Sequence, residues 1–277
     1  MTLSQLTIYG AGLIGGSIAL VARETGICER LVAVDLARPD SRPLQEVFDD
    51  WAVSPSEQDR ALKQADLTVL CVPVRSVVGL LPSLLDRTSG TVTDCGSTKV
   101  AIVEAVKDHP ERARFVAGHP MAGHPEGGLT NASQDMFARR RWILCPEGSS
   151  ASALSVVETL VTATGAEIVH LSAPEHDASV AWTSHVPQVV ASALSVHVHT
   201  HQAARAAGPG FASATRVAGG AEAMWSDIFG TNAHAIGNAL LELGQALQGL
   251  GLELQAGNVE ATLDLLAQAR ALRPPRN

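Results

Sequence analysis

Three glycines near the start of the chain have the spacing of a turn that binds a dinucleotide. Gly10, Gly12 and Gly15 directly follow a predicted strand and open a predicted helix. The first permits a tight turn, the second lets a pyrophosphate approach the backbone, and the third lets the helix pack on the strand. The pyrophosphate would lie on the free N–H groups at the start of this helix, at Leu13 and Ile14. A glycine-rich surface turn is the alternative.

The second predicted strand ends at Asp35, twenty residues after Gly15. A carboxylate at this place accepts hydrogen bonds from the ribose hydroxyls and repels a 2′-phosphate. The pair of signals predicts NAD as the cofactor rather than NADP. Arg38 follows closely and leaves NADP open as an alternative.

Two later strands end in loops that are expected to face the nicotinamide half of the cofactor. Ligands bind at the carboxyl ends of parallel strands in this architecture. The residues concerned are Cys71, Pro73 and Val74 in one loop and Gly96 in the other, where Ser97 follows. For Pro73 and Gly96 alone, ordinary loop punctuation is an equal explanation.

Two histidines lie in a Gly- and Pro-rich loop at the end of another predicted strand. His119 and His124 fall within the segment Gly118–Gly128. A histidine at this position can reach the nicotinamide and stay neutral near pH 7, ready to accept a proton. Taken alone, a surface-loop histidine is the better interpretation.

Together these motifs resemble the prephenate and arogenate dehydrogenase family of tyrosine biosynthesis. The resemblance spans nearly the whole chain, in order, and several spaced motifs are more specific than any one. The motifs are Gly10–Gly16 with Ser17, Asp94–Lys99, Gly118–Gly123, Glu175–Asp177, Ser184–Gln188, Gly210–Phe211 through Thr215–Arg216, and Met224–Phe229 with Asn232.

The resemblance implies NAD-dependent oxidative decarboxylation of a cyclohexadienyl acid. Prephenate would give 4-hydroxyphenylpyruvate and arogenate would give tyrosine, with hydride leaving ring C4 for the nicotinamide. By motif match, His119 is the proton or hydrogen-bond acceptor, and Ser97 orients it and touches the substrate hydroxyl. The chemistry also needs cations for the carboxylates and a wall that holds C4 against the cofactor.

The carboxylate anchor implied by the motif match is Arg216. Only Arg205 and Arg216 lie in the helical part before its final helix, and Arg216 follows a Gly-Pro-Gly break. Arg205 is the alternative anchor. Further substrate-binding candidates are His185, Gln188, Gly123 and His124, and helix packing is the alternative role for His185. Trp225 is interpreted as core or dimer wall.

The sequence departs from the common family pattern at two places. His124-Pro125 stands where many members have Ser or Thr and then Glu, and Ala212-Ser213 stands where a basic residue and Asp are frequent. Charges that would gate the pocket or read the substrate side chain are therefore missing, and His124 is a candidate substitute. The choice between prephenate and arogenate, and any feedback by tyrosine, stays open.

The elements that position these residues fall into two predicted domains. Short β-branched runs alternate with helical patterns up to about residue 171, which predicts a Rossmann-like α/β domain with a parallel sheet over residues 1–171. Ala- and Leu-rich helical periodicity then predicts an all-α domain over residues 172–277. Its helices carry apolar positions on more than one face, which favours a homodimer. The expected strands are 6–9, 31–34, 67–72, 91–94, 115–117, 142–145 and 167–170.

Composition excludes several other classes. A net charge of −8 over 277 residues argues against nucleic acid and anionic membranes as partners. The four cysteines form no C-x-x-C pair, which favours a reduced, cytoplasmic compartment. We expect neither a signal peptide nor a membrane span.

Two rival functions remain open, and one possible metal site is weighed separately. A β-hydroxyacid dehydrogenase would need a lysine early in the helical domain, where the chain has none. A non-catalytic NAD sensor or scaffold would fit the missing charges. His197 and His201 share a helical face, but without a third ligand a polar helix face is favoured over a metal site, so no metal is expected.

Overall fold

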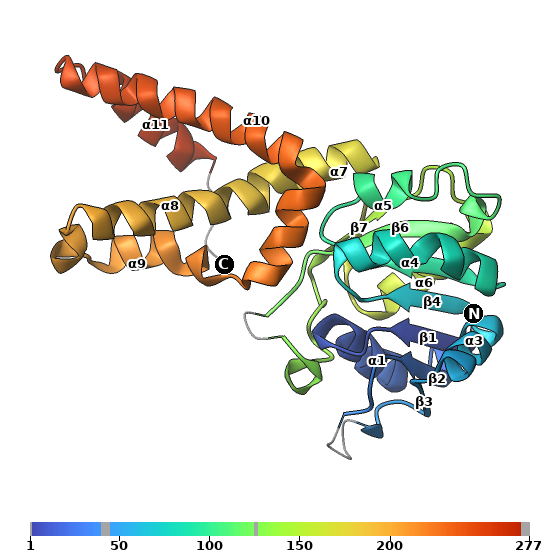
Figure 1. The fold of residues 1–277 in the computed structure, drawn as a ribbon. Helices are drawn as coiled ribbons and strands as arrows, with labels where there is room; N and C mark the ends of the chain where they lie inside the picture. Colours follow the sequence, from blue (N-terminus) through green and yellow to red (C-terminus); the bar gives the residue numbers. More distant parts are fainter. Residues whose placement is uncertain (1, 40–44, 125–126, 273–277) are drawn as a thin grey trace.

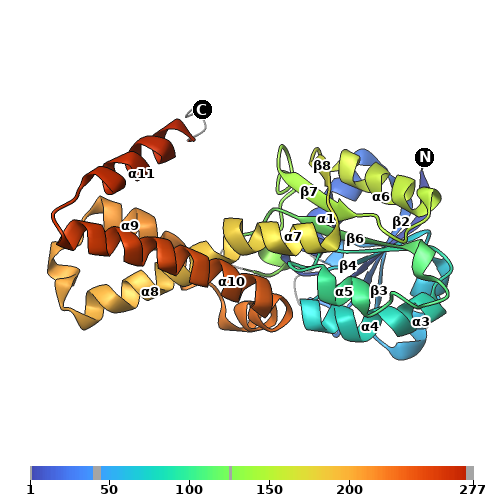
Figure 2. The same ribbon diagram turned by 90° about the horizontal axis from the view of Figure 1, so that it is seen from above.

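The computed structural model describes residues 2–39, 45–124 and 127–272. An α/β part, blue to yellow-green in Figure 1, precedes a helical part coloured gold to red. Figure 2 shows the helical part extending away from one side of the α/β part. Pro125, one of the departures from the family pattern, lies outside the described residues.

The α/β part is built on one eight-stranded sheet with the order β3-β2-β1-β4-β5-β6-β7-β8. Strands β1 to β6 run parallel, β7 is antiparallel to β6, and β8 is parallel to β7. The strands are β1 (Leu3–Tyr9), β2 (Cys28–Val34), β3 (Asp50–Ala52), β4 (Leu67–Leu70), β5 (Thr91–Asp94), β6 (Phe115–Pro120), β7 (Arg141–Cys145) and β8 (Glu167–His170).

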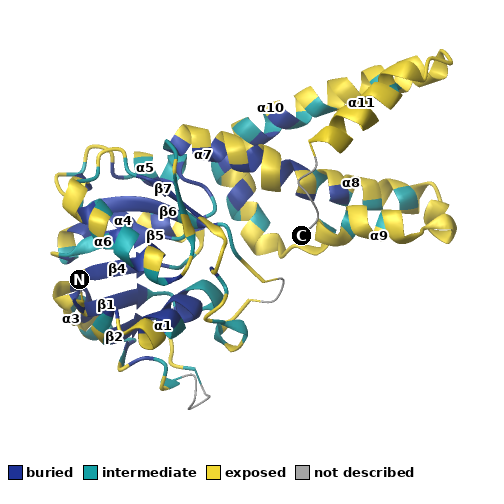
Figure 3. Cartoon of the chain, turned by 180° about the vertical axis from the view of Figure 1, so that it is seen from behind, coloured by how far each residue is buried: buried dark blue, intermediate teal, exposed yellow. Residues whose placement is uncertain are grey.

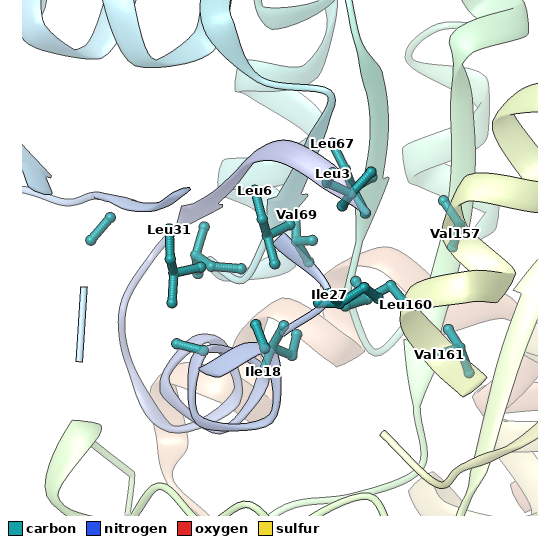
Figure 4. Close-up of a cluster of buried hydrophobic side chains, with 14 of the residues drawn as sticks. Leu3, Leu6, Ile18, Ile27, Leu31, Leu67, Val69, Val157, Leu160 and Val161 are labelled. Atoms are coloured by element: carbon teal, nitrogen blue, oxygen red, sulfur yellow. The ribbon is translucent and has the colours of Figure 1, made fainter. Parts of the chain in front are cut away.

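Helices cover both faces of this sheet because its strands are apolar on both sides. In the larger core, Ile18 of α1 and Leu160 of α6 pack with strand residues such as Leu6 (Figure 4). A second core lies under α4 and α5 on strands β4 to β7. The helices of this part are α1 (Leu13–Thr25), α3 (Pro55–Gln64), α4 (Val74–Arg87), α5 (Val100–Glu104) and α6 (Ala151–Ala163).

The expected parallel sheet has one antiparallel pair, β6 with β7, and β3 was not predicted. The connection from β6 to β7 holds, within its described residues, only the short 3-10 turn η2 (Leu129–Asn131). An antiparallel neighbour needs no crossover helix, whereas a parallel one does. Strand β3 has three residues and begins with Asp50, so it lacks the length and apolar pattern of a recognisable strand.

The helical part begins after β8 with α7, which starts at a capping box formed by Ser172 and Glu175. One π-helical turn, η3 (Ala181–His185), joins α7 to α8 without a break. The long helix α10 bends at Asn232, whose φ of −130° is not helical. The helices are α7 (Ala173–Val180), α8 (Val186–Thr200), α9 (Pro209–Thr215), α10 (Glu222–Gln255) and α11 (Glu260–Ala271), with short 3-10 turns η4 (Ala203–Ala206) and η5 (Arg216–Gly219).

The two parts touch where α7 packs on α5 and where the first half of α10 packs on α4. Away from these contacts, the far ends of α8 to α11 are mostly exposed (Figure 3). The predicted domain boundary after residue 171 stays a prediction. Among the described residues, no helix is both long and apolar enough to cross a membrane.

A buried ion pair ties β5 to β6 at the carboxyl edge of the sheet. Lys99 and Asp94 are both fully buried, and the Lys99 ammonium donates to the Asp94 carboxylate. Lys99 Nζ also donates to the Gly118 carbonyl at 2.7 Å, and Asp94 accepts from the N–H groups of Gly96 and Gly118 at 2.7 and 3.1 Å. Every polar atom of the pair therefore has a partner, which is the condition for burying two charges.

Replacing this lysine tests the structural role of the pair. We expect Lys99→Met to lower the free energy of unfolding by about 3–5 kcal/mol, because it leaves the Asp94 carboxylate buried without its cation. Lys107→Met is the matched control, since Lys107 pairs with Glu104 at the surface and should leave stability unchanged. Urea denaturation of both variants measures the difference, and equal stability would refute the assignment.

Candidate active site

Two adjoining cavities lie at the carboxyl edge of the sheet, between the α/β part and α10. The larger, of about 650 Å³, extends from the start of α1 to α10, and the smaller, of about 260 Å³, surrounds His119. Ser97, Met224 and Ile228 line both cavities. Groups bound in the two spaces would therefore meet beside Ser97.

The glycine turn opens onto the larger cavity. A Cβ on Gly10, whose φ is +96°, would lie 2.8 Å from the Cys71 carbonyl oxygen, and one on Gly15 would lie 2.1 Å from the Gly10 oxygen. A Cβ on Gly12 would meet nothing within 4 Å, so there is open space in front of the first turn of α1. That turn has no side-chain cap. Free N–H groups facing open space are what a pyrophosphate requires.

Asp35 lies at the rim of this turn. Its carboxylate accepts from the N–H of Ala11 at 2.8 Å and from that of Leu36 at 2.7 Å. The Arg38 guanidinium donates to the Trp51 carbonyl of β3 at 3.2 Å. The carboxylate therefore belongs to the glycine turn, whereas Arg38 is bonded to the edge strand.

The other predicted cofactor residues gather on the larger cavity. Its lining includes Leu13, Ile14, Cys71, Pro73, Val74 and Gly96. They come from the first turn of α1 and from the loops after β4 and β5, as the carboxyl-end rule predicts.

His119 is the outer member of a chain of hydrogen-bonded side chains. Its Nδ1 lies 2.8 Å from Nε2 of His176, and Nδ1 of His176 lies 2.7 Å from Oδ1 of Asp177. The Asp177 carboxylate also accepts from the N–H groups of Lys99 and Val100, at 2.7 and 2.9 Å. His176 and Asp177 are buried, while His119 is half-buried and lines the smaller cavity. The chain thus joins α7 to β6 and the start of α5.

Burial keeps two histidines of the site neutral. It lowers the pKa of His119 well below its usual value, and the nearby His176, Lys99 and His185 lower it further. Burial also lowers the pKa of His185 to about 4, with a smaller contribution from His176 and against the pull of Asp177. At neutral pH both rings can therefore accept a proton or a hydrogen bond.

His185 is brought to the smaller cavity by the π-helical turn between α7 and α8. Its Nδ1 lies 3.3 Å from Nδ2 of Asn232, which donates to the Asp177 carbonyl at 2.8 Å. The Trp225 ring stands edge-on to His185, with 5.9 Å between ring centroids, and lines the same cavity. Trp225 also packs against the buried cluster of Ala181, Ile228 and Ile236, as its interpretation as a core residue predicts.

The remaining predicted substrate residues are not all brought together. Gly123 lines the smaller cavity, but exposed His124 and buried Gln188 are not among its described lining residues. Arg216 is exposed on η5 and is not among the lining residues of either cavity. Whether these residues contact a substrate stays a prediction.

A cation that the sequence analysis missed lines the smaller cavity. The Arg140 side chain is exposed, immediately precedes β7, and shares the cavity with His119 and Ser97. Its neighbours Arg139 and Arg141 give a run of three arginines before Trp142. This run of arginines is the signal in the sequence that indicates a cation at this place.

His197 and His201 lie at the end of α8, where His201 directly follows the last helical residue, Thr200. The rings of His197 and His201 are 6.4 Å apart, and Nδ1 of His197 lies 2.9 Å from the Ala193 carbonyl oxygen. Within the described part of the chain, no group of three or more His, Cys, Asp or Glu side chains could hold a metal ion.

Two sequence models of one family match most of the chain. The one described as "Prephenate dehydrogenase, nucleotide-binding domain" matches residues 39–170, and "Prephenate dehydrogenase, dimerization domain" matches residues 172–268. The glycine turn precedes the first match, so its assignment rests on its own geometry.

Individual proteins agree with these matches. The chain is 32% identical to prephenate dehydrogenase of Bacillus subtilis over 237 residues, which are 80% of this chain and 62% of that protein. It is 30% identical to cyclohexadienyl dehydrogenase of Zymomonas mobilis over 251 residues, 84% of this chain and 82% of the relative. The crystal structure of prephenate dehydrogenase from A. aeolicus with hydroxyphenyl propionate and NAD+ is similar with a TM-score of 0.88, at 24% identity and 98% and 97% coverage. The chain spans less than two thirds of the length of the Bacillus relative.

The depressed pKa of His185 predicts a pH-dependent stability. Between pH 6.5 and about 4 the unfolded histidine binds a proton that the folded one does not, so its contribution is complete above pH 6.5 and is lost as the pH falls towards 4. We expect His185→Asn to lose less stability on acidification than the wild type, by up to about 3 kcal/mol. The exposed His199 on α8 supplies the control, His199→Asn. Urea denaturation at several pH values decides, and parallel curves for all three proteins would contradict the assignment.

Proposed function

The chain belongs to the prephenate dehydrogenase family, and we propose that it catalyses the NAD-dependent oxidative decarboxylation of prephenate. The observation that carries the proposal is the junction of the two cavities at Ser97. One cavity begins at a glycine turn suited to a pyrophosphate, and the other contains a neutral histidine and an arginine. A hydride acceptor and a hydroxylated ring acid can therefore be held side by side.

The glycine turn, Asp35 and the loops after β4 and β5 would hold NAD. The open space at Gly12 leaves room for the pyrophosphate on the first turn of α1. The Asp35 carboxylate, next to this turn, would accept hydrogen bonds from the ribose hydroxyls. The Asp35 carboxylate is bonded to the glycine turn, whereas the Arg38 guanidinium donates to the Trp51 carbonyl of β3, which favours NAD over NADP. When bound, NAD supplies the acceptor for the hydride of ring C4.

His119 would accept the proton of the C4 hydroxyl. Its lowered pKa keeps the ring unprotonated at neutral pH, and its exposed part lines the cavity. Ser97 would orient the hydroxyl, since it borders both cavities. As the hydroxyl loses its proton and C1 loses carbon dioxide, the ring becomes aromatic. The protein's task is to hold the hydroxyl, the carboxylates and C4 in place.

Prephenate carries two carboxylates, and two arginines are available to bind them. Arg140 lines the smaller cavity and would bind one carboxylate from the α/β part. Arg216, on η5, would bind the other from the helical part or from a second copy. A guanidinium is suited to this because its paired N–H groups match both oxygens of a carboxylate.

The cavity favours prephenate over arogenate. Arogenate has an ammonium group where prephenate has a keto group, and an ammonium group calls for a nearby carboxylate. The described residues lining the smaller cavity include Arg140 and two neutral histidines but no Asp or Glu. A dianionic substrate therefore fits the lining better than one with a positive charge.

The helical part supports assembly into a homodimer. The residues that match the dimerization-domain model include many large apolar side chains left exposed on α8, α10 and α11. Burial of such a surface against a second copy would remove it from water. The exposed apolar residues of these helices include Val190, Leu194, Leu241, Leu247, Leu252, Leu263 and Leu266.

The first experiment follows NADH formation with prephenate, then with arogenate, and repeats both with NADP. We expect turnover with prephenate and NAD, and His119→Asn should lower kcat by about 10²–10⁴ while NAD binding, measured by calorimetry, is retained. Because the pKa of His119 is lowered, kcat/KM should stay flat near neutrality and fall only well below pH 6.5. NAD binding without turnover of either acid would favour the non-catalytic sensor.

The second experiment locates the carboxylate anchors. Arg140→Ala should raise KM for prephenate at least about tenfold, equivalent to about 1.4 kcal/mol, with little change in NAD affinity. Arg141→Ala is the control, because this exposed neighbour is on β7 but is not among the cavity-lining residues. Arg216→Ala is measured alongside. A raised KM in Arg216→Ala with no change in Arg140→Ala would overturn the assignment of Arg140.

A further inference from the structure

We propose that His176, held by Asp177, fixes His119 in the tautomer with its proton on Nδ1, so that the Nε2 lone pair is the base in the cavity. The inference rests on the proposed function for the use of that base, but the tautomer itself is a property of the ligand-free protein. His176 and Asp177 are positioning residues, because they act on His119 and do not line either cavity.

The two carboxylate oxygens of Asp177 face hydrogen-bond donors. Oδ1 accepts from the Lys99 N–H at 2.7 Å and Oδ2 accepts from the Val100 N–H at 2.9 Å. Backbone N–H groups cannot accept, so both oxygens act as acceptors. Oδ1 also lies 2.7 Å from Nδ1 of His176, and this nitrogen must therefore carry a hydrogen.

The position of the hydrogen on His176 determines which nitrogen of His119 carries a hydrogen. A neutral His176 with its hydrogen on Nδ1 has a lone pair on Nε2. Nε2 lies 2.8 Å from Nδ1 of His119, which must then be the donor of this hydrogen bond. His119 is left with its lone pair on Nε2. The hydrogen bond made by one ring nitrogen thus sets the role of the other.

The opposite arrangement would require a doubly protonated His176. An imidazolium at His176 would be fully buried, with Asp177 at one ring nitrogen and His119 at the other. It would also turn Nε2 of His119 into a donor, which cannot accept the substrate proton. The neutral form avoids both consequences.

Neighbouring residues hold the hydrogen-bonded side chains of Asp177, His176 and His119 in place. Asn232 donates to the Asp177 carbonyl at 2.8 Å, and the Ser172–Glu175 capping box fixes the start of α7. His176 is packed against His119 with rings 5.0 Å apart at 64°. Free histidine favours the tautomer with the proton on Nε2, so a positioned acceptor is needed to hold the other one.

Two replacements of His176 of nearly equal length separate hydrogen bonding from packing. Gln can place its amide oxygen near the former Nε2 and accept from His119, whereas Met fills similar space and accepts poorly. We expect His176→Met to lower kcat by on the order of 10², with little change in KM, and His176→Gln to stay within about tenfold of the wild type. Equal losses in Gln and Met, or wild-type kcat in Met, would overturn the proposal.

A spectroscopic measurement tests the tautomer without activity. Imidazole ¹⁵N shifts of the full-length, ligand-free protein distinguish a protonated nitrogen from one with a lone pair, and His119→Asn assigns the signal. We expect His119 of the wild type to carry its proton on Nδ1, and His176→Met to shift it towards Nε2. A wild-type proton on Nε2 overturns the inference. A proton on Nδ1 in a protein that does not turn over prephenate would leave it standing and refute the proposed function.

Discussion

The carboxylate of Asp177 is the contact on which the site depends. It lies on α7 of the helical part, yet both of its oxygens accept hydrogen bonds from backbone N–H groups at the start of α5 in the α/β part. Oδ1 of Asp177 accepts from the Lys99 N–H and is also the hydrogen-bond partner of His176. The same carboxylate therefore joins the two parts of the chain and orients His119 through His176. A displacement of α7 along the sheet would therefore change the geometry of His119 as well as the interface. This coupling affects catalysis, because a misplacement of a catalytic group by 1 Å can lower the reaction rate by a large factor.

The charge that a substrate meets in the site depends on which charged side chains are buried, and not on how many the chain carries. The chain has a net charge of −8, which opposes the approach of a dianion, so attraction must come from local groups. Lys99 cannot provide it, because its ammonium is fully buried and bonded to Asp94 and the Gly118 carbonyl. Its role is to tie the loop after β5 to β5 and β6, and it adds to the effect of burial in lowering the pKa of His119. Among the described residues that line the smaller cavity, Arg140 is the cation that a substrate can reach without disturbing the core.

The features that the sequence predicted well are those encoded by neighbours along the chain. Three local patterns were predicted and are found in the fold: the turn at Gly10, the end of β2 next to Asp35, and the strand that carries His119. Each combines a short apolar run with a glycine or a polar residue.

The direction of β7 was missed because strand polarity depends on the connection and not on the strand's own residues. Arg140 was missed for a related reason. It approaches His119 only because β7 pairs with β6, with Ile143 opposite His119, and no spacing in the sequence shows this register. The motif Glu175–Asp177 was recognised, but its function could not be read without the distance from His176 to His119.

The bend in α10 lets the first part of one helix line the cavities while its second part extends the helical part of the chain. At Asn232 the backbone leaves helical geometry, and the side chain instead donates to the Asp177 carbonyl and approaches Nδ1 of His185. The helix before the bend turns towards the α/β part, where Met224 and Ile228 separate and line the two spaces, while the helix after it runs out into the exposed end of the helical part (Figure 1). A straight helix could not do both, since its axis would continue past the sheet. The residue at the bend is therefore also one whose side chain contacts both Asp177 and His185.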